Sequence, residues 1–164
     1  MDILNHTGDL LFQVPEGWEP VFGNRDLLAG AQLRGAQLGA VDLGGANLCH
    51  ANLVGADLYH SFLNRTNLSG ANLDGACLRG ADIEDSDLRF ANLRNADLSS
   101  SAIGGLTRLG GANLLGADVT NATFDGALYD ASTVFPEGFS PEDHGMLTFE
   151  DYQELISASS KQLP

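Results

Sequence analysis

The chain has 164 residues, of which 43% are hydrophobic and 18% are charged, a composition typical of a folded protein and not of a disordered one. Its 22 acidic residues outnumber the 8 lysines and arginines, and the formal charge of −14 argues against direct binding to nucleic acid or to an anionic membrane surface. Two cysteines are too few for a disulfide framework, and no apolar stretch approaches the roughly 20 residues of a membrane span.

Residues 1–25 precede any repeat and predict a non-repeating N-terminal cap. Residues 1–12 carry no lysine or arginine and only a short apolar run, so no secretory signal is expected and a cytoplasmic location is predicted. The open end of a repeat rod exposes apolar core and unpaired backbone groups. The apolar residues of this segment supply the cover for such an end: Leu10, Leu11, Phe12, Val14, Trp18, Val21 and Phe22.

Residues 26–135 repeat with a period of five. A large apolar residue recurs at every fifth position from Leu28 to Ile103, and the series resumes one residue out of step from Leu109 to Val134. Of these 22 central positions, 16 are leucine, and the position two residues earlier is alanine in 14 units. The position between them is usually Asn or Asp, and the last position is often Gly. A regular, non-helical architecture follows.

The period matches neither an α-helix, which repeats about every 3.6 residues, nor a β-strand, which repeats about every 2 residues. The chain must therefore turn a corner once per unit, and four units form a square coil with the leucines and small residues inside. With coils about 4.8 Å apart, the units predict about five to six coils. Glycine supplies the corner dihedrals. The extra residue after Gly104 and Gly105 predicts a corner bulge near residues 104–108.

Several units carry the pattern Ala-Asn/Asp-Leu, and these units resemble the pentapeptide-repeat family: Ala46-Asn47-Leu48, Ala71-Asn72-Leu73 and Ala91-Asn92-Leu93. The resemblance covers residues 26–135, and residues 133–139 are similar to the tails of cyanobacterial members. It implies an all-β solenoid, a right-handed quadrilateral β-helix, in agreement with the square coil. It also implies a candidate role, because some members resemble a DNA duplex in size and charge and bind type II topoisomerases.

Residues 136–164 predict a C-terminal cap with one or two short α-helices. The segments 140–143 and 148–151 are typical of helix starts. In the second helix Phe149, Tyr152, Leu155 and Ile156 share one face. We expect that face to cover the end of the coil. Docking of a second molecule is the alternative, so the chain is expected to be a monomer or an end-to-end dimer through a cap.

The outward positions form columns, because every fourth unit returns to the same face of the coil. The first column predicts an amide ladder that hydrogen-bonds from coil to coil, and two further columns are mixed. The expected members are Gln32, Asn52, Asn72, Asn92 and Asn113 in the ladder; Gln37, Asp57, Cys77, Asp97 and Asp118 in the second column; and Asp42, Phe62, Asp82 and Ala102 in the third.

A candidate protein-contact patch combines two aromatic residues with an acidic run. Tyr59 and Phe62 are the least expected outward residues, and Asp82, Glu84 and Asp85 belong to the densest acidic run of the repeats. Isolated surface apolar residues are common, so a plain surface and a solvated acidic corner are the alternatives. A calcium site is not expected, because side chains of one flat unit splay outward from two faces.

No catalytic, metal or cofactor site is expected. His50 and His60 lie on opposite faces and cannot share a metal, and Cys49 and Cys77 are likewise too far apart for a disulfide. The recurring Gly-x-x-x-x-Gly spacing is a by-product of the period, and no Lys-Ser/Thr follows it. A rod with a filled core offers no concave pocket, so the chain is not expected to be an enzyme.

Two functions remain open at the level of the sequence. The first is a non-catalytic protein-interaction or scaffold module with an unidentified protein partner and no nucleic-acid or membrane binding. The alternative is a DNA mimic that binds gyrase and inhibits or protects it. Residues 26–135 contain 12 acidic and 6 basic residues, so more than half of the net charge lies in the two end segments. This distribution favours the first function.

Overall fold

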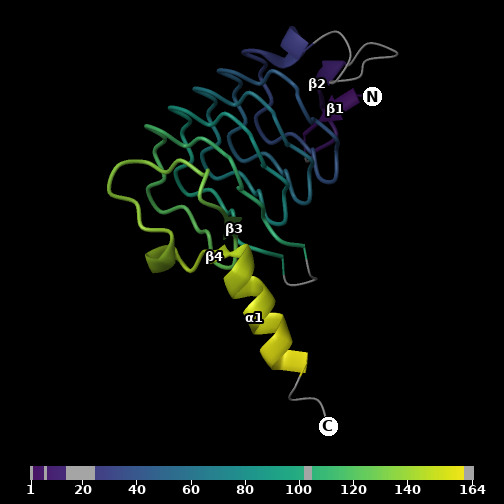
Figure 1. Cartoon of the computed structure of the whole chain (residues 1–164). Coiled ribbons are helices and arrows are strands. Elements are labelled where there is room, and N and C mark those ends of the chain that lie inside the picture. Colours follow the sequence, from purple (N-terminus) through teal and green to yellow (C-terminus); the bar gives the residue numbers. More distant parts are fainter. Residues whose placement is uncertain (1, 6, 14–24, 102–104, 161–164) are drawn as a thin grey trace.

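The computed structural model describes residues 2–5, 7–13, 25–101 and 105–160. The chain begins with an antiparallel hairpin, winds into a rod of stacked coils and ends in a helix that projects from the rod (Figure 1). The regular elements are β1 (Asp2–Leu4), β2 (Leu10–Gln13), the 3₁₀ turn η1 (Arg25–Leu28), β3 (Leu128–Tyr129), the 3₁₀ turn η2 (Glu142–His144), β4 (Leu147–Thr148) and α1 (Phe149–Ser160).

The coils are joined by single-residue parallel bridges on four faces, because each side is too short for a longer strand. Along most of the rod the partners are four repeat units apart, as in Gln37 with Asp57 and Asn47 with Asn67. At a regular side, three backbone hydrogen bonds join neighbouring coils. Leu53 N–H donates to Asn72 O over 2.7 Å, Gly55 N–H donates to Asp74 O over 2.9 Å, and the C=O of Ala51 accepts from the N–H of Asn72 over 2.9 Å. The repeat thus satisfies the backbone from coil to coil.

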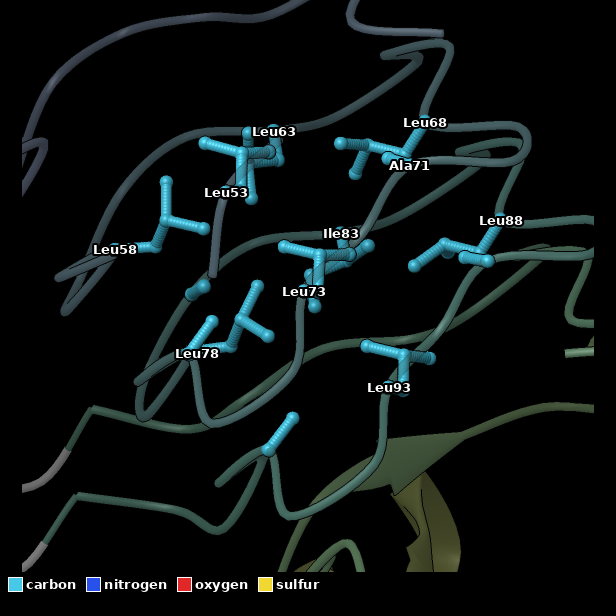
Figure 2. Close-up of a cluster of buried hydrophobic side chains, with 14 of the residues drawn as sticks. Leu53, Leu58, Leu63, Leu68, Ala71, Leu73, Leu78, Ile83, Leu88 and Leu93 are labelled. Atoms are coloured by element: carbon cyan, nitrogen blue, oxygen red, sulfur yellow. The ribbon is translucent and has the colours of Figure 1, made fainter. Parts of the chain in front are cut away.

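The core consists of the two inward columns that the period predicts. The central leucines and the alanines two residues before them are almost completely buried, and Figure 2 shows the leucines stacked in layers through the middle of the rod. Several units place a hydroxyl residue in the alanine column, among them Ser61, Thr66, Ser86 and Thr107. Thr66 Oγ1 donates to Leu43 O over 2.9 Å and Ser86 Oγ donates to Leu63 O over 2.5 Å, whereas the buried Oγ of Ser61 has no partner among the described residues.

The predicted one-residue bulge is wrong. Cys77 pairs with Asp97, exactly four repeat units later, but Asp82 pairs with Arg108 where Ala102 would continue the series, so this coil contains six extra residues. Leu109 and not Ile103 continues the column of Ile83, because Ile83 N–H donates to Arg108 O over 2.8 Å. Ser101 and Ile103 imitate a repeat unit in the sequence, but Thr107 and Leu109 are the fully buried pair. Ile103 itself lies outside the described residues, as does Ala102.

This longer insertion moves every later unit by one face, so the predicted columns are wrong beyond it. Asn113 pairs with Asp87 and therefore lies outside the amide ladder, whereas Asp118 pairs with Asn92 and ends the ladder's column. A second shift follows, because Asn113 pairs with Val134 and not with Thr133, which adds one residue to that coil. Val134 therefore points outward and is 41% exposed, and Phe135 packs against the core in its place.

The two ends of the rod are built differently. At the N-terminal end Ile3 of β1 is buried, and Leu4 O accepts a 2.8 Å hydrogen bond from Gln37 N–H. Leu11 packs against the core, while Val14, Trp18, Val21 and Phe22 lie outside the described residues. At the C-terminal end the buried ring of Phe124 contacts Phe139, with their centroids 5.2 Å apart.

Helix α1 does not bury its apolar face against the rod. Phe149, Leu155 and Ile156 are 61%, 53% and 43% exposed, and the helix extends away from the coils (Figure 1). Aromatic packing of Phe135, Phe139 and His144 around Phe124 occupies the place that this helix was expected to cover. The expectation failed because amphipathic spacing specifies an apolar face but not the surface on which it packs.

Candidate interaction surface

One face of the rod, here called the Phe62 face, carries most of the predicted contact residues. Its column consists of Asp42, Phe62, Asp82, Arg108 and Leu128, joined by successive parallel bridges, and Leu128 at its end is only 8% exposed. Phe62 is half exposed and lies between two carboxylates. Because adjacent coils are hydrogen-bonded, this column holds its side chains at a fixed spacing on a rigid support. The face is therefore preorganised for contact with another macromolecule.

Cations from the neighbouring coils neutralise part of the acidic run. Glu84 Oε1 lies 2.6 Å from the guanidinium of Arg108, and Asp85 Oδ2 lies 3.6 Å from Nε of Arg65. Both pairs are substantially exposed, so they contribute little to stability. They change the character of the predicted patch, since the corner beside Asp82 is a mixed-charge surface and not a purely acidic one.

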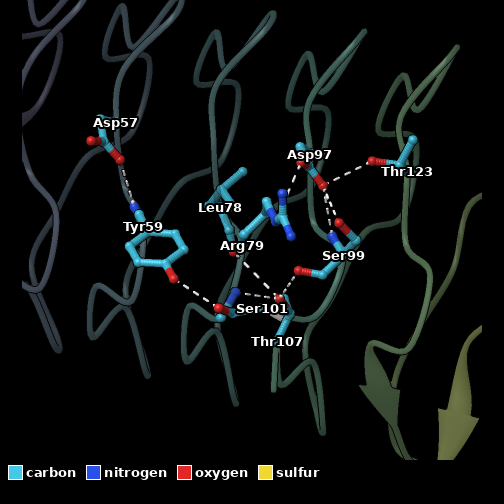
Figure 3. A network of polar contacts seen from close by, with 10 residues as sticks. Asp57, Tyr59, Leu78, Arg79, Asp97, Ser99, Ser101, Thr107 and Thr123 are labelled. Atoms are coloured by element: carbon cyan, nitrogen blue, oxygen red, sulfur yellow. Dashed lines mark hydrogen bonds and ion pairs between the residues drawn. The ribbon is translucent and has the colours of Figure 1, made fainter. Parts of the chain in front are cut away.

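Tyr59 lies at the corner that precedes Phe62 and holds the insertion in place. Its hydroxyl lies 2.7 Å from Ser101 Oγ, and its ring packs edge-on against His60 with centroids 4.3 Å apart. Thr107, at the end of the insertion, accepts from Gly80 N–H over 2.7 Å and donates to Ser99 O over 2.8 Å. Figure 3 shows this network. Tyr59 is therefore half-buried, and only part of it faces outward.

Asp97 is the centre of the same network (Figure 3). It accepts hydrogen bonds from the hydroxyls of Ser99 and Thr123 and lies 3.7 Å from Nε of Arg79. Burial raises the pKa of Asp97, but the hydrogen bonds from Ser99 and Thr123 and the charge of Arg79 outweigh burial and lower the pKa below its ordinary value. The carboxylate form thus ties the chain at Ser99, where the insertion begins, to Arg79 and Thr123 of the neighbouring coils.

A pocket of about 530 Å³ lies at the C-terminal end of the Phe62 face. Arg108, Glu84 and Asp130 provide charges, and Leu106, Leu128 and Phe149 provide apolar surface. Hydrogen bonds to Asp130, above all from the Ser132 hydroxyl, lower the pKa of this carboxyl. Burial and the neighbouring Glu142 carboxylate raise the pKa of Tyr129, whose hydroxyl donates to Glu142 Oε1 over 2.9 Å. Such a mixture suits the side chains of a protein partner.

Arg108, Leu128 and Phe149 line this pocket although none of them was predicted to do so, because the residues after the insertion were predicted on the wrong face. The unit Thr107-Arg108-Leu109 has the same small–polar–leucine order as Ala-Asn-Leu, and that order was the available signal. The expected amide ladder is present on another face: Asn52 Nδ2 donates to Gln32 Oε1 over 3.1 Å and Asn92 Nδ2 donates to Asn72 Oδ1 over 2.9 Å.

Residues with metal-binding or redox chemistry are dispersed. No group of three or more His, Cys, Asp or Glu side chains within the described ranges is placed to hold a metal ion. Cys49 and Cys77 are free thiols. His50 leans over Gly70 and His60 leans over Gly80, so both rings fill space at the corners of the rod. No helix in the described part of the chain has the length and apolar character needed to cross a membrane.

The repeat geometry is shared with known proteins. The family model for pentapeptide repeats matches residues 31–70 and 66–101 with eight copies. The solved structure of alr5209, a pentapeptide repeat protein from Nostoc Pcc 7120, is 36% identical with a TM-score of 0.50, and the match covers 65% of this chain and 84% of that one. The chain belongs to the pentapeptide-repeat family. Its fold is accordingly a right-handed quadrilateral β-helix.

A second pentapeptide repeat protein, Rfr23 from the cyanobacterium Cyanothece 51142, is 31% identical with a TM-score of 0.57. The match covers 62% of this chain and 65% of Rfr23, so this chain spans slightly less than two thirds of that relative. The fluoroquinolone resistance protein QnrB1 also matches, at 17% identity and a TM-score of 0.37, and nothing about the partner of this chain follows from it. No curated protein matches the sequence.

Proposed function

We propose that this pentapeptide-repeat protein is a non-catalytic protein-interaction or scaffold module that binds its partner through the Phe62 face. The observation that carries the proposal is the continuity of this face. Half-exposed Phe62 leads through Asp82 and Arg108 to the pocket beside Leu128 and Phe149. Aromatic, arginine and aliphatic groups on a rigid support are the usual anchors of protein interfaces.

The proposal includes the architecture that places this face. We infer about five to six coils over residues 26–135, between an N-terminal cap of residues 1–25 and a C-terminal cap of residues 136–164. The bridge series from Asp42 to Leu128 supports the coils, and the pairing of β3 with β4 joins the C-terminal segment to the last of them. The aromatic packing around Phe124 supports a C-terminal cap made by the segment before α1 and not by α1 itself. A cytoplasmic location is part of the same proposal.

Affinity capture from the native host tests the proposal with three bait proteins. Wild type and Phe90→Ala are expected to recover the same stoichiometric partner, because Phe90 is exposed at a different corner of the rod. The double variant Phe62→Ala with Arg108→Ala is expected to lose that partner while it keeps the wild-type circular-dichroism spectrum. Equal recovery by all three baits, or no stoichiometric partner for any of them, would overturn the proposal.

The alternative, a gyrase-binding DNA mimic, has less support from the charge distribution. Five arginines of the rod form ion pairs with acidic residues of the rod: Arg65 with Asp85, Arg79 with Asp97, Arg89 with Asp87, Arg94 with Asp118 and Arg108 with Glu84. These pairs interrupt the negative surface that a duplex mimic requires. A gyrase supercoiling assay tests this alternative. A DNA mimic would inhibit or protect gyrase at micromolar concentrations of this protein.

A further inference from the structure

A different face of the rod ends with an unpaired backbone edge. This face, here called the amide face, carries Gln32, Asn52, Asn72, Asn92 and Asp118. Between its last two coils, Leu93 N–H donates to Asp118 O over 2.8 Å and Asn95 N–H donates to Thr120 O over 3.0 Å. The C=O of Ala91 accepts from Asp118 N–H over 2.9 Å. Each coil on this face thus presents two donors and one acceptor to the coil that follows.

In the last coil the same three groups are the N–H of Val119, the N–H of Asn121 and the C=O of Ala117. None of them has a hydrogen-bond partner within the described ranges. The Phe62 face differs, because its last coil strand β3 pairs with β4 in parallel. Three unpaired groups in the register of a parallel bridge form a template for a further strand.

A groove of about 420 Å³ lies beside this edge. Residues 117–121 form one wall, and Pro136, Glu137 and Phe139 form the other, with His144 at the side. Asp118 and Glu137 bring carboxylates to the groove. Arg94 of the preceding coil lies 3.3 Å from Asp118 Oδ2 and no lysine or arginine lines the groove, so Glu137 supplies its uncompensated charge. Glu137, Glu142 and Asp143 lie in the segment before α1, and that segment contains no lysine or arginine. This charge opposes a second copy of the same end and favours a basic partner.

We propose that this groove binds an extended basic segment of a partner protein, which adds to the amide face as one further parallel strand. One residue of the segment donates its N–H to Ala117 O and accepts from Val119 N–H, and the residue two positions later accepts from Asn121 N–H. The residue between them points inward over Val119 and is apolar. A lysine or arginine in the segment lies within reach of Asp118 and Glu137. Main-chain bonds supply affinity, and these side chains supply specificity.

The probe is a capped synthetic peptide with the sequence of residues 88–97, because in the rod this strand already follows the strand at Asn72 in the required parallel geometry. Asn92 N–H donates to Ala71 O over 2.9 Å, and the carbonyls of Asn92 and Arg94 accept from the N–H groups of Leu73 and Gly75 over 2.7 and 2.8 Å. The peptide contains the apolar Leu93 between Asn92 and Arg94, with Arg89 as a second cation. The matched control peptide differs only by N-methylation of the Asn92 amide, which removes the N–H that Ala117 O would accept. A second control replaces both arginines with glutamate.

The readout is amide hydrogen exchange of the full-length protein by NMR. In the free protein, Val119 and Asn121 are expected to exchange rapidly while Leu93 and Asn95 are protected. Saturating probe is expected to slow exchange at Val119 and Asn121 by at least about tenfold, and neither control peptide is expected to do so. Equal protection by the N-methylated peptide, or no protection by the probe, would overturn the proposal.

Two further results would also contradict it. Protection of Val119 and Asn121 in the free protein would mean that the edge is already occupied, and a dimer mass by light scattering would identify a second copy as the occupant. Equal binding of the glutamate peptide would remove the requirement for a basic partner. The groove and the Phe62 face are separate surfaces. Failure of the strand-binding proposal therefore leaves the proposed function of the Phe62 face unaffected, and failure of the proposed function leaves the strand-binding proposal unaffected.

Discussion

Some corner glycines of this repeat are required by a side chain of the coil before them. Phe90 has a left-handed backbone, and its ring leans over the same corner of the next coil, where Gly116 is found. His50 leans over Gly70 in the same way. A β-carbon on Gly116 would lie 2.7 Å from Cδ1 of Phe90, which is too close for an ordinary contact. Where a corner ring leans over the next coil in this way, that corner is occupied by glycine.

Gly116→Ala is expected to destabilise the protein by about 1–3 kcal/mol more than Gly75→Ala does. Both glycines have a positive φ, so both substitutions carry left-handed strain, but no atom lies within 4 Å of a β-carbon on Gly75. Urea unfolding followed by circular dichroism measures the two free energies of unfolding. Adding Phe90→Ala to Gly116→Ala should remove the extra cost. If it does not, contact with the ring is not its cause.

Asp97 makes the bonding of its coil to the two neighbouring coils dependent on pH. Its folded-state pKa lies below the ordinary value near 3.8, so its carboxylate form stabilises the native state above that pH. That contribution is lost as the pH falls from about 4 through the lowered folded-state pKa. Asp97→Asn is expected to be less stable than wild type at neutral pH, with a difference that narrows on acidification. A difference that stays constant between about pH 6 and pH 3 would contradict this account.

At the scale of elements, helix α1 is stabilised locally and not by the rod. Thr148 Oγ1 accepts from Asp151 N–H over 3.1 Å, and Asp151 Oδ2 accepts from Thr148 N–H over 3.0 Å. This reciprocal pair is a capping box, which satisfies backbone donors at the start of the helix. The exposure of Phe149, Leu155 and Ile156 leaves few contacts that could couple the helix to the coils.

Thr148→Ala is therefore expected to reduce the helix without weakening the rod. Loss of the cap costs the helix about 1 kcal/mol, which is enough to lower the population of a short exposed helix. Far-UV circular dichroism should show less helical signal, while the Tm of the β-helix stays at the wild-type value. A parallel fall in Tm would mean that α1 packs on the rod in solution. Ser157→Ala, near the other end of the helix, is the matched control.

At the scale of the whole molecule, the stability of the rod depends on its inward columns of leucine and of small residues. These columns stay aligned because each coil contains four repeat units along most of the rod. Each coil contacts only its neighbours, as in other solenoids, so a complete coil is an interchangeable unit. Asn47 and Asn67 occupy equivalent places in successive coils, and so do Leu48 and Leu68. The core is continuous only while leucine lies on leucine and small residues lie on small residues.

Deletion of residues 46–65 is expected to leave a shorter rod that still unfolds cooperatively, because Gly45 is then followed by Thr66 in the place of Ala46. A deletion two residues shorter is the control, since it moves every later leucine out of its column. Thermal unfolding followed by circular dichroism distinguishes the two proteins. The repeat model fails if both deletions fold equally well, or if neither of them folds.

The sequence by itself determined the square coil, its leucine and alanine columns and the amide ladder up to Asn92, because these depend on a local period. Only the tertiary structure decided where the chain rejoins the regular coil after Leu98. Ser101 with Ile103 and Thr107 with Leu109 both match the repeat, and backbone pairing with the preceding coil selects the second pair. The same pairing places Arg108 on the Phe62 face and leaves Val119 at an open edge. Hydrogen bonds between coils determine which of two locally equivalent units pairs with the preceding coil. These bonds join residues far apart in the sequence, so the local pattern does not specify them.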